Sequence, residues 1–424
     1  MGLLRICVNL FPVRPGGGAG VETFCRWVVD IPNRVETTHE FTVLLHPSQG
    51  QRSARVERGK PFDPFAVVPP PMVTPPVTPP KASLLERAYW NPLFPPGFRD
   101  GWRFLKRRFS QTGPLGRRSW LETKDFDVIH CPYQHLDPEP EDHARIPYCM
   151  NLHDLQHEHF PQFFTPRELE ERRRLWPLCA KIAKVIFVVA DHVKADVVHY
   201  CGVAPEKVHV VWPGPPFEGL PPVTEEQRSS LRQRHVLPDR FMVYPAVTWE
   251  HKNHIRLLEA AGRIRRRRGY RIPLVFTGHK GPYHERVLAK AADLGLEGQV
   301  HWLGYIPYAD VRCLYTMADA AVVPTLYEAS SGPVLEAMSM GCPVACATVA
   351  NLPWVAQEGR AGILFDPMDI ESIEDAIERL WEDSSLRNRL SVAGPERVGQ
   401  FSWKSFAEGY LRGYEQAAIA GGHE

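Results

Sequence analysis

The sequence predicts an α/β protein built from two doubly wound, Rossmann-like domains that face a central cleft. Short apolar segments alternate with helical segments along the chain, a pattern typical of parallel sheets covered by helices. A Pro- and Gly-rich stretch without periodicity, from Pro213 to Pro222, indicates a linker between two halves. The length of 424 residues is enough for two or three domains of ordinary size.

The predicted strands are short apolar segments, each followed by a loop with Gly, Pro, His or Asp and usually by a helix. In the first half they are Ile6–Leu10, Phe41–Leu45, Val128–Cys131, Tyr148–Leu152, Val185–Val189 and Val208–Val211. In the second half they are Phe241–Tyr244, Leu274–Thr277, Val300–Trp302, Ala320–Val323, Val344–Ala345 and Gly362–Phe365. Ligands in such sheets bind outside the carboxyl ends of the strands, so we expect the site in the loops that follow them.

Residues from about 61 to 120 interrupt this alternation with several Pro pairs, followed by the basic and aromatic stretch Trp102–Phe109. A loop of this length is usually functional or disordered. One interpretation is contact with an anionic membrane surface or a lipid-linked acceptor. The other, which we favour, is an ordinary surface helix under a Pro-rich excursion. A second basic run, Arg263–Arg268, is interpreted as the solvated end of a helix that begins near His254.

The composition is that of a soluble globular protein, with 44% hydrophobic and 23% charged residues and a formal net charge of +1. This charge gives no support to a nucleic-acid partner. No apolar run approaches the length of a membrane span, and the chain starts directly with a strand pattern rather than a signal peptide. The nine Cys form no CxxC pair, so we interpret them as reduced, mostly buried thiols of a cytoplasmic protein. Cys342 and Cys346 lack further ligands at zinc-site spacing.

The most informative segment runs from Pro324 to Met338 and carries Glu328 and Glu336. A strand leads into this loop, and Gly332-Pro333 opens a helix, because Pro is tolerated at the first helical position. One carboxylate therefore precedes a helix N-terminus and the other lies in its first turns. Free amides and hydroxyls between them suit a ligand with both phosphate and sugar hydroxyls. Either Glu alone could simply complement the helix dipole, but the pair with its flanks is far more specific.

Three other strand ends carry polar groups. The glycines after the first strand, including Gly17 and Gly18, let the backbone approach a ligand but lack the dinucleotide spacing. His153 begins the segment His-Asp-Leu-Gln-His-Glu-His, which has neither the HExxH order nor an evident third metal ligand, so we favour an imidazole bound to a sugar hydroxyl. Lys252 starts a helix after a strand, where it is placed for a phosphate or is simply solvated.

Taken together, these segments resemble the retaining glycosyltransferases of family 4, which have the two-domain GT-B fold. The resemblance covers nearly the whole chain. Its strongest part is the Glu-x7-Glu motif from Glu328 to Glu336 with the Ala337–Val344 segment that follows. The His251-Lys252-Asn253 turn, the Leu303–Ile306 turn, the Gly17-Gly18 loop and the His153-Asp154 strand end are also typical.

The resemblance implies an enzyme that moves a sugar from a nucleotide donor to an acceptor hydroxyl without a metal or other cofactor. Its expected catalytic residues are Glu328 at the donor sugar, His153 at the same sugar from the opposite domain, and Lys252 at the diphosphate. Glu336 would bind the ribose hydroxyls. The remaining donor-binding residues it implies are Ser330, Ser331, Gly332, Gly278, Lys280, Tyr305, Ile306, Gly17 and Gly18.

The chain departs from the family pattern in three places. The Arg that usually precedes the Lys is absent from Val247–Trp249, so diphosphate neutralisation falls to Lys252 and a residue such as Lys280. The usual Glu-Gly-Phe-Gly-Leu-Pro run is replaced by Glu328–Pro333, in which Ser hydroxyls stand in for backbone contacts. Trp354 stands where Glu is common after Leu-Pro.

We therefore expect residues 1–213, completed by a C-terminal helix at about 403–424, to form the acceptor domain. Residues 214–402 would form the domain that binds the nucleotide sugar. The acceptor is a sugar, a lipid-linked molecule or a natural product, and peripheral contact at the inner membrane face stays open. Two rival functions are an epimerase that turns over nucleotide sugar on the same fold, and a silent subunit that binds donor and supports a partner transferase.

Overall fold

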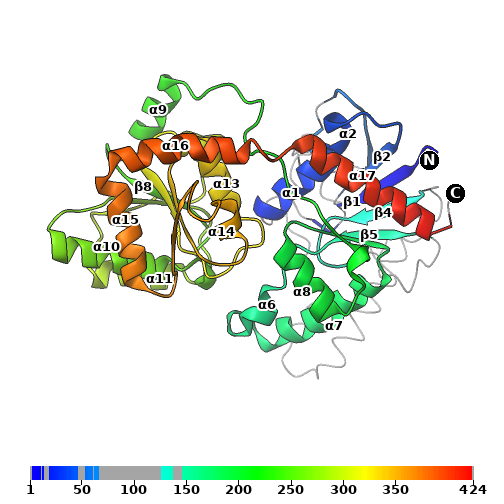
Figure 1. Ribbon diagram of the computed structural model, residues 1–424, viewed down its shortest axis with the longest axis horizontal. Coiled ribbons are helices and arrows are strands. Elements are labelled where there is room, and N and C mark those ends of the chain that lie inside the picture. The colour runs from blue at the N-terminus through cyan, green and yellow to red at the C-terminus, as the bar shows by residue number, and fades with distance from the viewer. Residues whose placement is uncertain are drawn as a thin grey trace, which may run out of the picture.

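The computed structural model describes residues 2–10, 12–13, 19–45, 53–60, 62–65, 126–136 and 146–422. Gly17, Gly18, most of the Pro-rich insertion and the Trp102–Phe109 stretch lie outside the described residues. Figure 1 shows two lobes side by side, each with a central sheet and helices packed around it. This arrangement confirms the predicted pair of doubly wound domains.

The N-terminal lobe contains a seven-stranded sheet of order β3-β2-β1-β4-β5-β6-β7. Its strands are β1 (Arg5–Asn9), β2 (Glu40–Leu44), β3 (Ser53–Val56), β4 (Val128–Cys131), β5 (Tyr148–Asn151), β6 (Val185–Val188) and β7 (Val208–Val210). Only β3 runs antiparallel to its neighbour. The sequence analysis missed β3, because it is a four-residue edge strand in which Val56 alone is buried and its pattern carries no apolar signal.

The C-terminal lobe contains a six-stranded parallel sheet of order β10-β9-β8-β11-β12-β13. Its strands are β8 (Met242–Pro245), β9 (Leu274–Thr277), β10 (Val300–Trp302), β11 (Ala320–Val323), β12 (Val344–Ala347) and β13 (Ile363–Phe365). In both sheets the strand order reverses beside the first strand, between β1 and β4 and between β8 and β11. Such a reversal opens a crevice at the carboxyl edge where ligands bind.

Helices follow most strands. Those of the N-terminal lobe are α1 (Ala19–Val29), α2 (Ile31–Arg34), α6 (Gln156–His159), α7 (Pro166–Ile182), α8 (Asp191–Cys201) and α17 (Trp403–Ala420), with short 3-10 turns η3 (Pro161–Phe163) and η4 (Pro205–Lys207). Those of the C-terminal lobe are α9 (Glu225–His235), η5 (Glu250–Lys252), α10 (His254–Arg268), α11 (His284–Asp293), α12 (Tyr308–Tyr315), α13 (Gly332–Ser339), α14 (Leu352–Val355), α15 (Ile370–Glu382) and α16 (Ser384–Val398).

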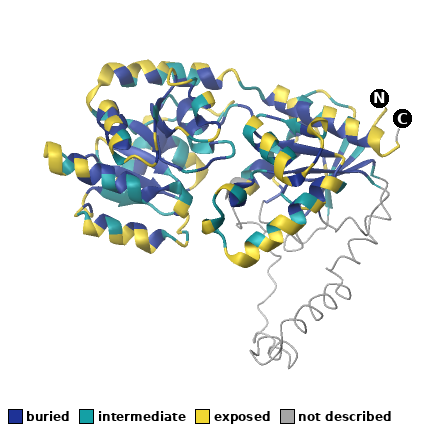
Figure 2. Cartoon of the chain, turned by 60° about the horizontal axis from the view of Figure 1, so that its bottom comes forward, coloured by how far each residue is buried: buried dark blue, intermediate teal, exposed yellow. Residues whose placement is uncertain are grey.

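The cores lie on the faces of the two sheets. In β1, Ile6 and Val8 join one apolar cluster of the N-terminal lobe while Cys7 joins the cluster on the opposite face, as the two-residue period of a strand requires. The C-terminal lobe has one large cluster built from both faces of its sheet. Figure 2 shows the result: the strands are buried, and the helices are buried on their inner sides and exposed on their outer sides.

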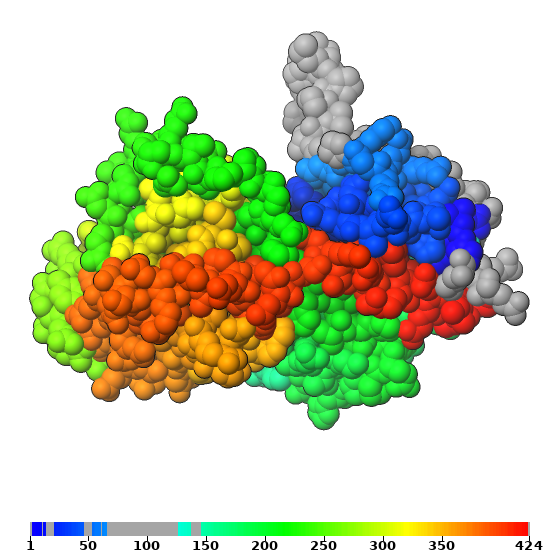
Figure 3. Space-filling view, turned by 45° about the horizontal axis from the view of Figure 1, so that its top comes forward, coloured from blue at the N-terminus to red at the C-terminus, as the bar shows by residue number. Residues whose placement is uncertain are grey.

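The last helix, α17, belongs in space to the first lobe. It contacts β4, β5 and β6, and in Figure 3 the chain from α16 to α17 forms a continuous band across both lobes. The second crossing is the linker after β7, which contacts the start of α17: Trp403 Nε1 donates to the Pro215 carbonyl at 3.1 Å. A Cβ atom on Gly214 would lie 2.4 Å from the Trp403 ring, so this crossing requires glycine.

A buried polar network fastens α17 to the sheet. Asn151 Nδ2 donates to the Tyr410 hydroxyl at 2.9 Å, so Asn151 Oδ1 is the acceptor for His130 Nε2 at 2.8 Å. The other ring nitrogen, Nδ1, then accepts from the Tyr414 hydroxyl at 2.8 Å. Both nitrogens of a neutral His130 are thereby satisfied, as a fully buried imidazole requires.

The basic run at the end of α10 differs from the expectation of a merely solvated helix end. Arg263 and Arg267 form ion pairs of 2.9 and 2.8 Å with Glu374, whose side chain is 1% exposed. Arg267 and Arg268 also pair with Glu378 of the same helix, α15. The run therefore joins α10 to α15, since an almost fully buried carboxylate is stable only with such partners.

All nine Cys are free and buried, which confirms that their thiols lie in the interior. Among the described residues, no helix has both the length and the apolar character needed to cross a bilayer.

Candidate active site

Two loops meet at the reversal point of the C-terminal sheet. One follows β8 and covers residues 246–253, and the other follows β11 and covers residues 324–331; they lie side by side because β8 and β11 are paired. The His251 carbonyl ties them together by accepting from the Leu326 amide at 2.7 Å and from Thr325 Oγ1 at 3.2 Å. The predicted residues Lys252 and Glu328 are thus placed by one fastened pair of loops.

Lys252 and Glu328 contact each other directly. Lys252 Nζ lies 2.6 Å from Glu328 Oε1, and the two side chains are only 18% and 10% exposed. The Tyr244 hydroxyl donates to the Lys252 carbonyl at 3.1 Å, which fixes the backbone of η5. Sequence reasoning assigned the two groups to different parts of one ligand, and the structure brings them together as an ion pair at the end of the sheet.

Both loops contain a residue in the left-handed backbone region. Asn253 has φ 58° and Ser331 has φ 54°, a conformation that costs free energy for residues other than glycine and clusters at functional sites. Asn253 is held there by donating to the carbonyls of Pro324 and Pro367, each at 2.9 Å. Ser331 is 1% exposed and its hydroxyl has no hydrogen-bond partner. A buried unpaired hydroxyl beside a helix N-terminus is a ready donor for a ligand oxygen.

Helix α13 begins at Gly332, as expected, with Ser330 and Ser331 just before it. Since Pro333 has no amide hydrogen, the amides available at this helix N-terminus are those of the preceding loop and of Gly332. A Cβ on Gly332 would lie 3.9 Å from Glu336 Oε1, so the carboxylate lies back over the first turn toward these amides.

Two tyrosines hold the Glu336 carboxylate. The Tyr308 hydroxyl donates to Oε1 at 2.9 Å, and the Tyr315 hydroxyl donates to Oε2 at 3.1 Å. Burial raises the pKa of Glu336 above its ordinary value, while the two hydrogen bonds act in the opposite direction. Sequence reasoning missed both tyrosines, although their seven-residue spacing on α12 places them on one helix face.

The loops after β9 and β10 complete this edge. Gly278 has φ +137°, and a Cβ there would lie 2.6 Å from the Ala246 carbonyl oxygen, so only glycine allows the β8 and β9 loops to approach so closely. The Gly278 amide donates to the Gly304 carbonyl at 2.8 Å. Lys280 is exposed beside it. Tyr305 is 59% exposed and stacks on His279 at 4.4 Å, whereas Ile306 is buried.

His153 follows β5 at the carboxyl edge of the N-terminal sheet. Its Nε2 lies 3.2 Å from the Pro132 carbonyl and its ring meets the edge of Phe24 at 4.6 Å. Burial lowers the pKa of His153. A neutral ring that donates from Nε2 leaves Nδ1 as an acceptor for a hydroxyl. Within the described residues, His153 is not hydrogen-bonded to Lys252, Glu328 or Glu336.

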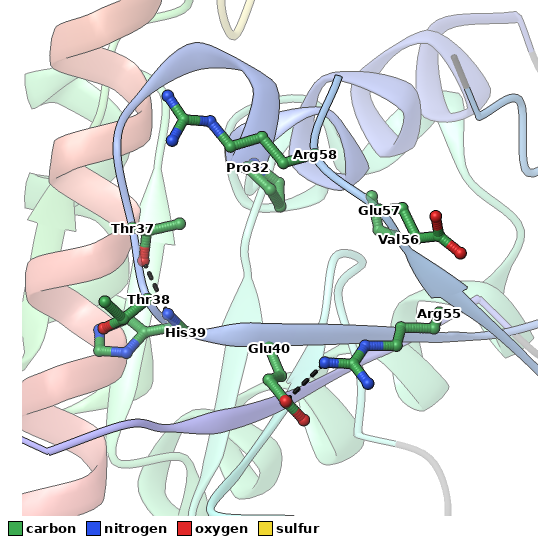
Figure 4. Close-up of a pocket in the computed structure, with 9 residues that line it drawn as sticks. All are labelled: Pro32, Thr37, Thr38, His39, Glu40, Arg55, Val56, Glu57 and Arg58. Carbon is green, nitrogen blue, oxygen red and sulfur yellow. Dashed lines mark hydrogen bonds and ion pairs between the residues drawn. The ribbon is translucent and has the colours of Figure 1, made fainter. Parts of the chain in front are cut away.

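A pocket of about 400 Å³ lies elsewhere, at the amino edge of the N-terminal sheet. Figure 4 shows its lining around β2 and β3, where Arg55 pairs with Glu40 and the His39 amide donates to Thr37 Oγ1 at 3.1 Å. It contains none of the predicted site residues. Its lining is Pro32, Thr37, Thr38, His39, Glu40, Arg55, Val56, Glu57 and Arg58.

Over the part of the chain that the structure describes, no three His, Cys, Asp or Glu side chains form a group that could hold a metal ion. The described groups that bring positive charge to this edge are Lys252, Lys280 and the N-terminus of α13.

Two family models match the chain. Residues 37–216 match the family described as glycosyltransferase family 4, and residues 227–397 match the family described as glycosyl transferases group 1. The boundary between these matches falls in the linker that the sequence predicts.

Similar proteins extend over both lobes. The O-antigen chain mannosyltransferase B of Escherichia coli is 29% identical over 302 residues, which are 70% of this chain and 77% of that protein. The sucrose-phosphate synthase from Thermosynechococcus elongatus superposes with a TM-score of 0.70 at 17% identity, over 98% of this chain and all of that one. Anabaena HepE, solved in complex with UDP and glucose, gives a TM-score of 0.65 at 15% identity over 96% of this chain and 98% of that one. At these identities the solved structures establish a shared fold.

Proposed function

Since the chain belongs to the glycosyltransferases of family 4 and is an enzyme with the GT-B fold, we propose that it moves a sugar from a nucleoside-diphosphate sugar to an acceptor hydroxyl with retention and without a metal. The observation that carries this proposal is the Lys252–Glu328 pair at the sheet reversal, beside the N-terminus of α13. A cation, a carboxylate and free amides at one edge match the chemistry of a diphosphate joined to a sugar.

The proposed donor lies along this edge. Lys252 takes the diphosphate charge together with the amides before Gly332, the Ser331 hydroxyl and the exposed Lys280. Glu336, oriented by its two tyrosines, accepts hydrogen bonds from the ribose hydroxyls. The nucleobase lies against the backbone at Tyr305 and Ile306. HepE has been solved with UDP and glucose, which supports a nucleoside-diphosphate donor for this chain as well.

The proposed reaction breaks the bond between the anomeric carbon and the diphosphate oxygen. Lys252 and the helix N-terminus stabilise the negative charge that develops on the leaving phosphate, an electrostatic contribution of the oxyanion-hole kind. Glu328 holds hydroxyls of the donor sugar, and a neutral His153 accepts a hydrogen bond from the opposite domain. The acceptor hydroxyl attacks the anomeric carbon from the face that the diphosphate leaves and gives its proton to the departing diphosphate oxygen, which gives retention.

For the acceptor substrate and the cellular location, the proposal names classes rather than one molecule or one compartment. We propose that the N-terminal domain binds a sugar, a lipid-linked molecule or a natural product, and that the enzyme works in the cytoplasm with peripheral membrane contact in the lipid-linked case. Its relative from E. coli is named for O-antigen chain synthesis, which favours a polysaccharide or glycoconjugate acceptor.

The first experiment screens UDP-glucose, UDP-N-acetylglucosamine, GDP-mannose and related donors by thermal shift, since a ligand that binds the native state raises the melting temperature. Transfer from the best donor is then measured with excess EDTA, and the anomeric configuration of the product is read by NMR. We expect transfer to survive the chelator and the product to keep the donor's anomeric configuration. Activity that is lost with EDTA and restored by Mg²⁺ or Mn²⁺ contradicts metal independence, and an inverted product contradicts retention.

A further inference from the structure

Tyr327, the residue before Glu328, is buried in the other domain. The residue is 8% exposed. The rings around it are those of His159 at 5.5 Å, His192 at 6.1 Å and Phe160 at 6.3 Å. All three rings belong to the N-terminal lobe, on α6, on α8 and just after α6. A loop of the C-terminal domain therefore inserts an aromatic side chain into the N-terminal domain.

The wall of this Tyr327 pocket is itself fixed. His159 Nε2 lies 2.7 Å from Asp196 Oδ2, which joins the end of α6 to α8. Burial, followed by the negative charges of Asp154 and Asp196, raises the pKa of Tyr327. The hydroxyl lies near Asp196 and the Leu155 backbone, both in the N-terminal lobe. It has no hydrogen bond of good geometry, so the well-defined contacts of Tyr327 are those of its ring.

The residue on the other side of Glu328 also contacts the N-terminal lobe. Ala329 packs against the apolar clusters on both faces of the N-terminal sheet. Glu328, whose side chain is 10% exposed, therefore lies between two residues that contact the opposite domain.

Lys252 has a similar neighbour. The ring of His251 lies 6.4 Å from that of Phe163 in η3 of the N-terminal lobe. The His251 carbonyl is also the group that ties the two loops together. The segment from α6 to η3 therefore contacts the residue before each member of the Lys252–Glu328 pair.

From these contacts we propose that Tyr327 and Ala329 are positioning residues, through which docking of the two domains sets the placement of Glu328 and its ion pair with Lys252. This proposal rests on the proposed function of the pair at the donor. It also gives the His-rich segment after β5 a role in addition to that of His153, because His159 and Phe160 form the pocket for the Tyr327 ring.

The test compares Tyr327→Ala with Tyr327→Phe, which keeps the ring, and with Ala329→Gly, which removes one methyl group. Tyr270→Ala is the matched control, because Tyr270 packs only on the C-terminal core and donates to Glu382 within the same domain. Small-angle scattering of the ligand-free proteins reports the separation of the domains. Calorimetry with UDP and with GDP reports nucleotide binding, and release of UDP or GDP from UDP-glucose or GDP-mannose reports turnover.

We expect Tyr327→Ala to increase the radius of gyration and to lower kcat at least tenfold, with the donor KM and the nucleotide affinity within threefold of the wild type. Ala329→Gly should lower kcat in the same direction but less. Tyr327→Phe and Tyr270→Ala should leave kcat within threefold. An unchanged scattering curve and kcat in a folded Tyr327→Ala protein would overturn the proposal, as would a parallel loss of nucleotide affinity, which indicates damage within the C-terminal domain.

The two proposals can fail separately. If the wild type binds neither UDP nor GDP and releases neither from UDP-glucose or GDP-mannose, the proposed function is wrong for these donors. The proposed role of Tyr327 in placing Glu328 is then wrong as well. The scattering comparison still decides whether Tyr327 holds the domains together.

Discussion

His130 makes the N-terminal lobe sensitive to acid, and the size of the effect follows from its burial. Burial, partly opposed by the hydrogen bond with Asn151, lowers the pKa of His130 from 6.5 to about 3. The unfolded chain binds a proton at this imidazole below its ordinary pKa, whereas the folded state does not. The stabilising contribution is therefore fully present above pH 6.5 and is lost as the pH falls toward about 3.

The magnitude can be worked out from these two values. Between about pH 7.5 and about pH 4.5, one such imidazole lowers the free energy of unfolding by roughly 2–3 kcal/mol. The expected result is that His130→Phe loses stability at neutral pH, since Asn151 and Tyr414 lose a partner, but shows a pH dependence weaker than the wild type by roughly 2–3 kcal/mol over this range.

The assay is urea unfolding followed by circular dichroism at both pH values. The matched control is His199→Phe on the exposed face of α8, which removes an imidazole outside the buried network. His251 and His254 of the C-terminal lobe have pKa values lowered to about 3 as well, so the wild type keeps an acid sensitivity that the variant shares. If His130→Phe and the wild type lose the same free energy between the two pH values, the reasoning is refuted.

Three further predictions concern the site, α15 and the insertion. Glu336→Ala should weaken binding of UDP or GDP by about 1.5–3 kcal/mol, because it removes hydrogen bonds from the ligand to a charged carboxylate. Binding of the acceptor substrate should be nearly unchanged. Calorimetry on the folded variant measures this, and an unchanged nucleotide affinity contradicts the role of Glu336 in donor binding. Glu374→Gln should lower the free energy of unfolding of the C-terminal lobe by about 1–3 kcal/mol in urea, less than the loss of a fully buried ion pair, because the Arg partners of Glu374 reach water. The control Asp375→Asn, at an exposed position, should change this free energy by less than about 0.5 kcal/mol. If the two variants lose the same free energy, the Glu374 network does not stabilise the lobe. In the segment outside the described residues, joint replacement by Ser should reduce transfer to the acceptor while donor hydrolysis persists; the residues replaced are Trp102, Phe104, Arg107 and Arg108. If both activities fall equally, or if neither changes, the segment has a structural role.

Much of the fold could be predicted because buried parallel strands are short apolar runs. Each predicted strand is present, with ends that differ by at most two residues. The exception, β3, is an edge strand with one buried residue, and its pairing depends on β2 rather than on its own pattern. Local periodicity cannot detect such a strand.

The site could be predicted only as a set of positions. Lys252, Glu328 and Glu336 were placed on their loops and helix from local signals alone. Their partners could not be identified in that way, because the ion pair joins residues 76 apart in the sequence, and Tyr308 lies 28 residues from Glu336. The pocket for Tyr327 forms only when the two domains dock, so no local sequence pattern predicts it. Tertiary contacts of this kind are the information that a single sequence leaves out.

The double crossing of the chain has a consequence for its synthesis. The seven strands of the first sheet leave the ribosome before the second sheet, yet the helix that satisfies His130 and Asn151 is made only after it. With 192 residues between Val210 and Trp403, and a synthesis rate of about 5–20 residues per second, the first domain waits roughly 10–40 s for α17. During that interval a face of the sheet and its polar groups are uncovered. Uncovered apolar and polar surface of this kind favours aggregation, so the nascent first domain is exposed to misassembly until α17 arrives.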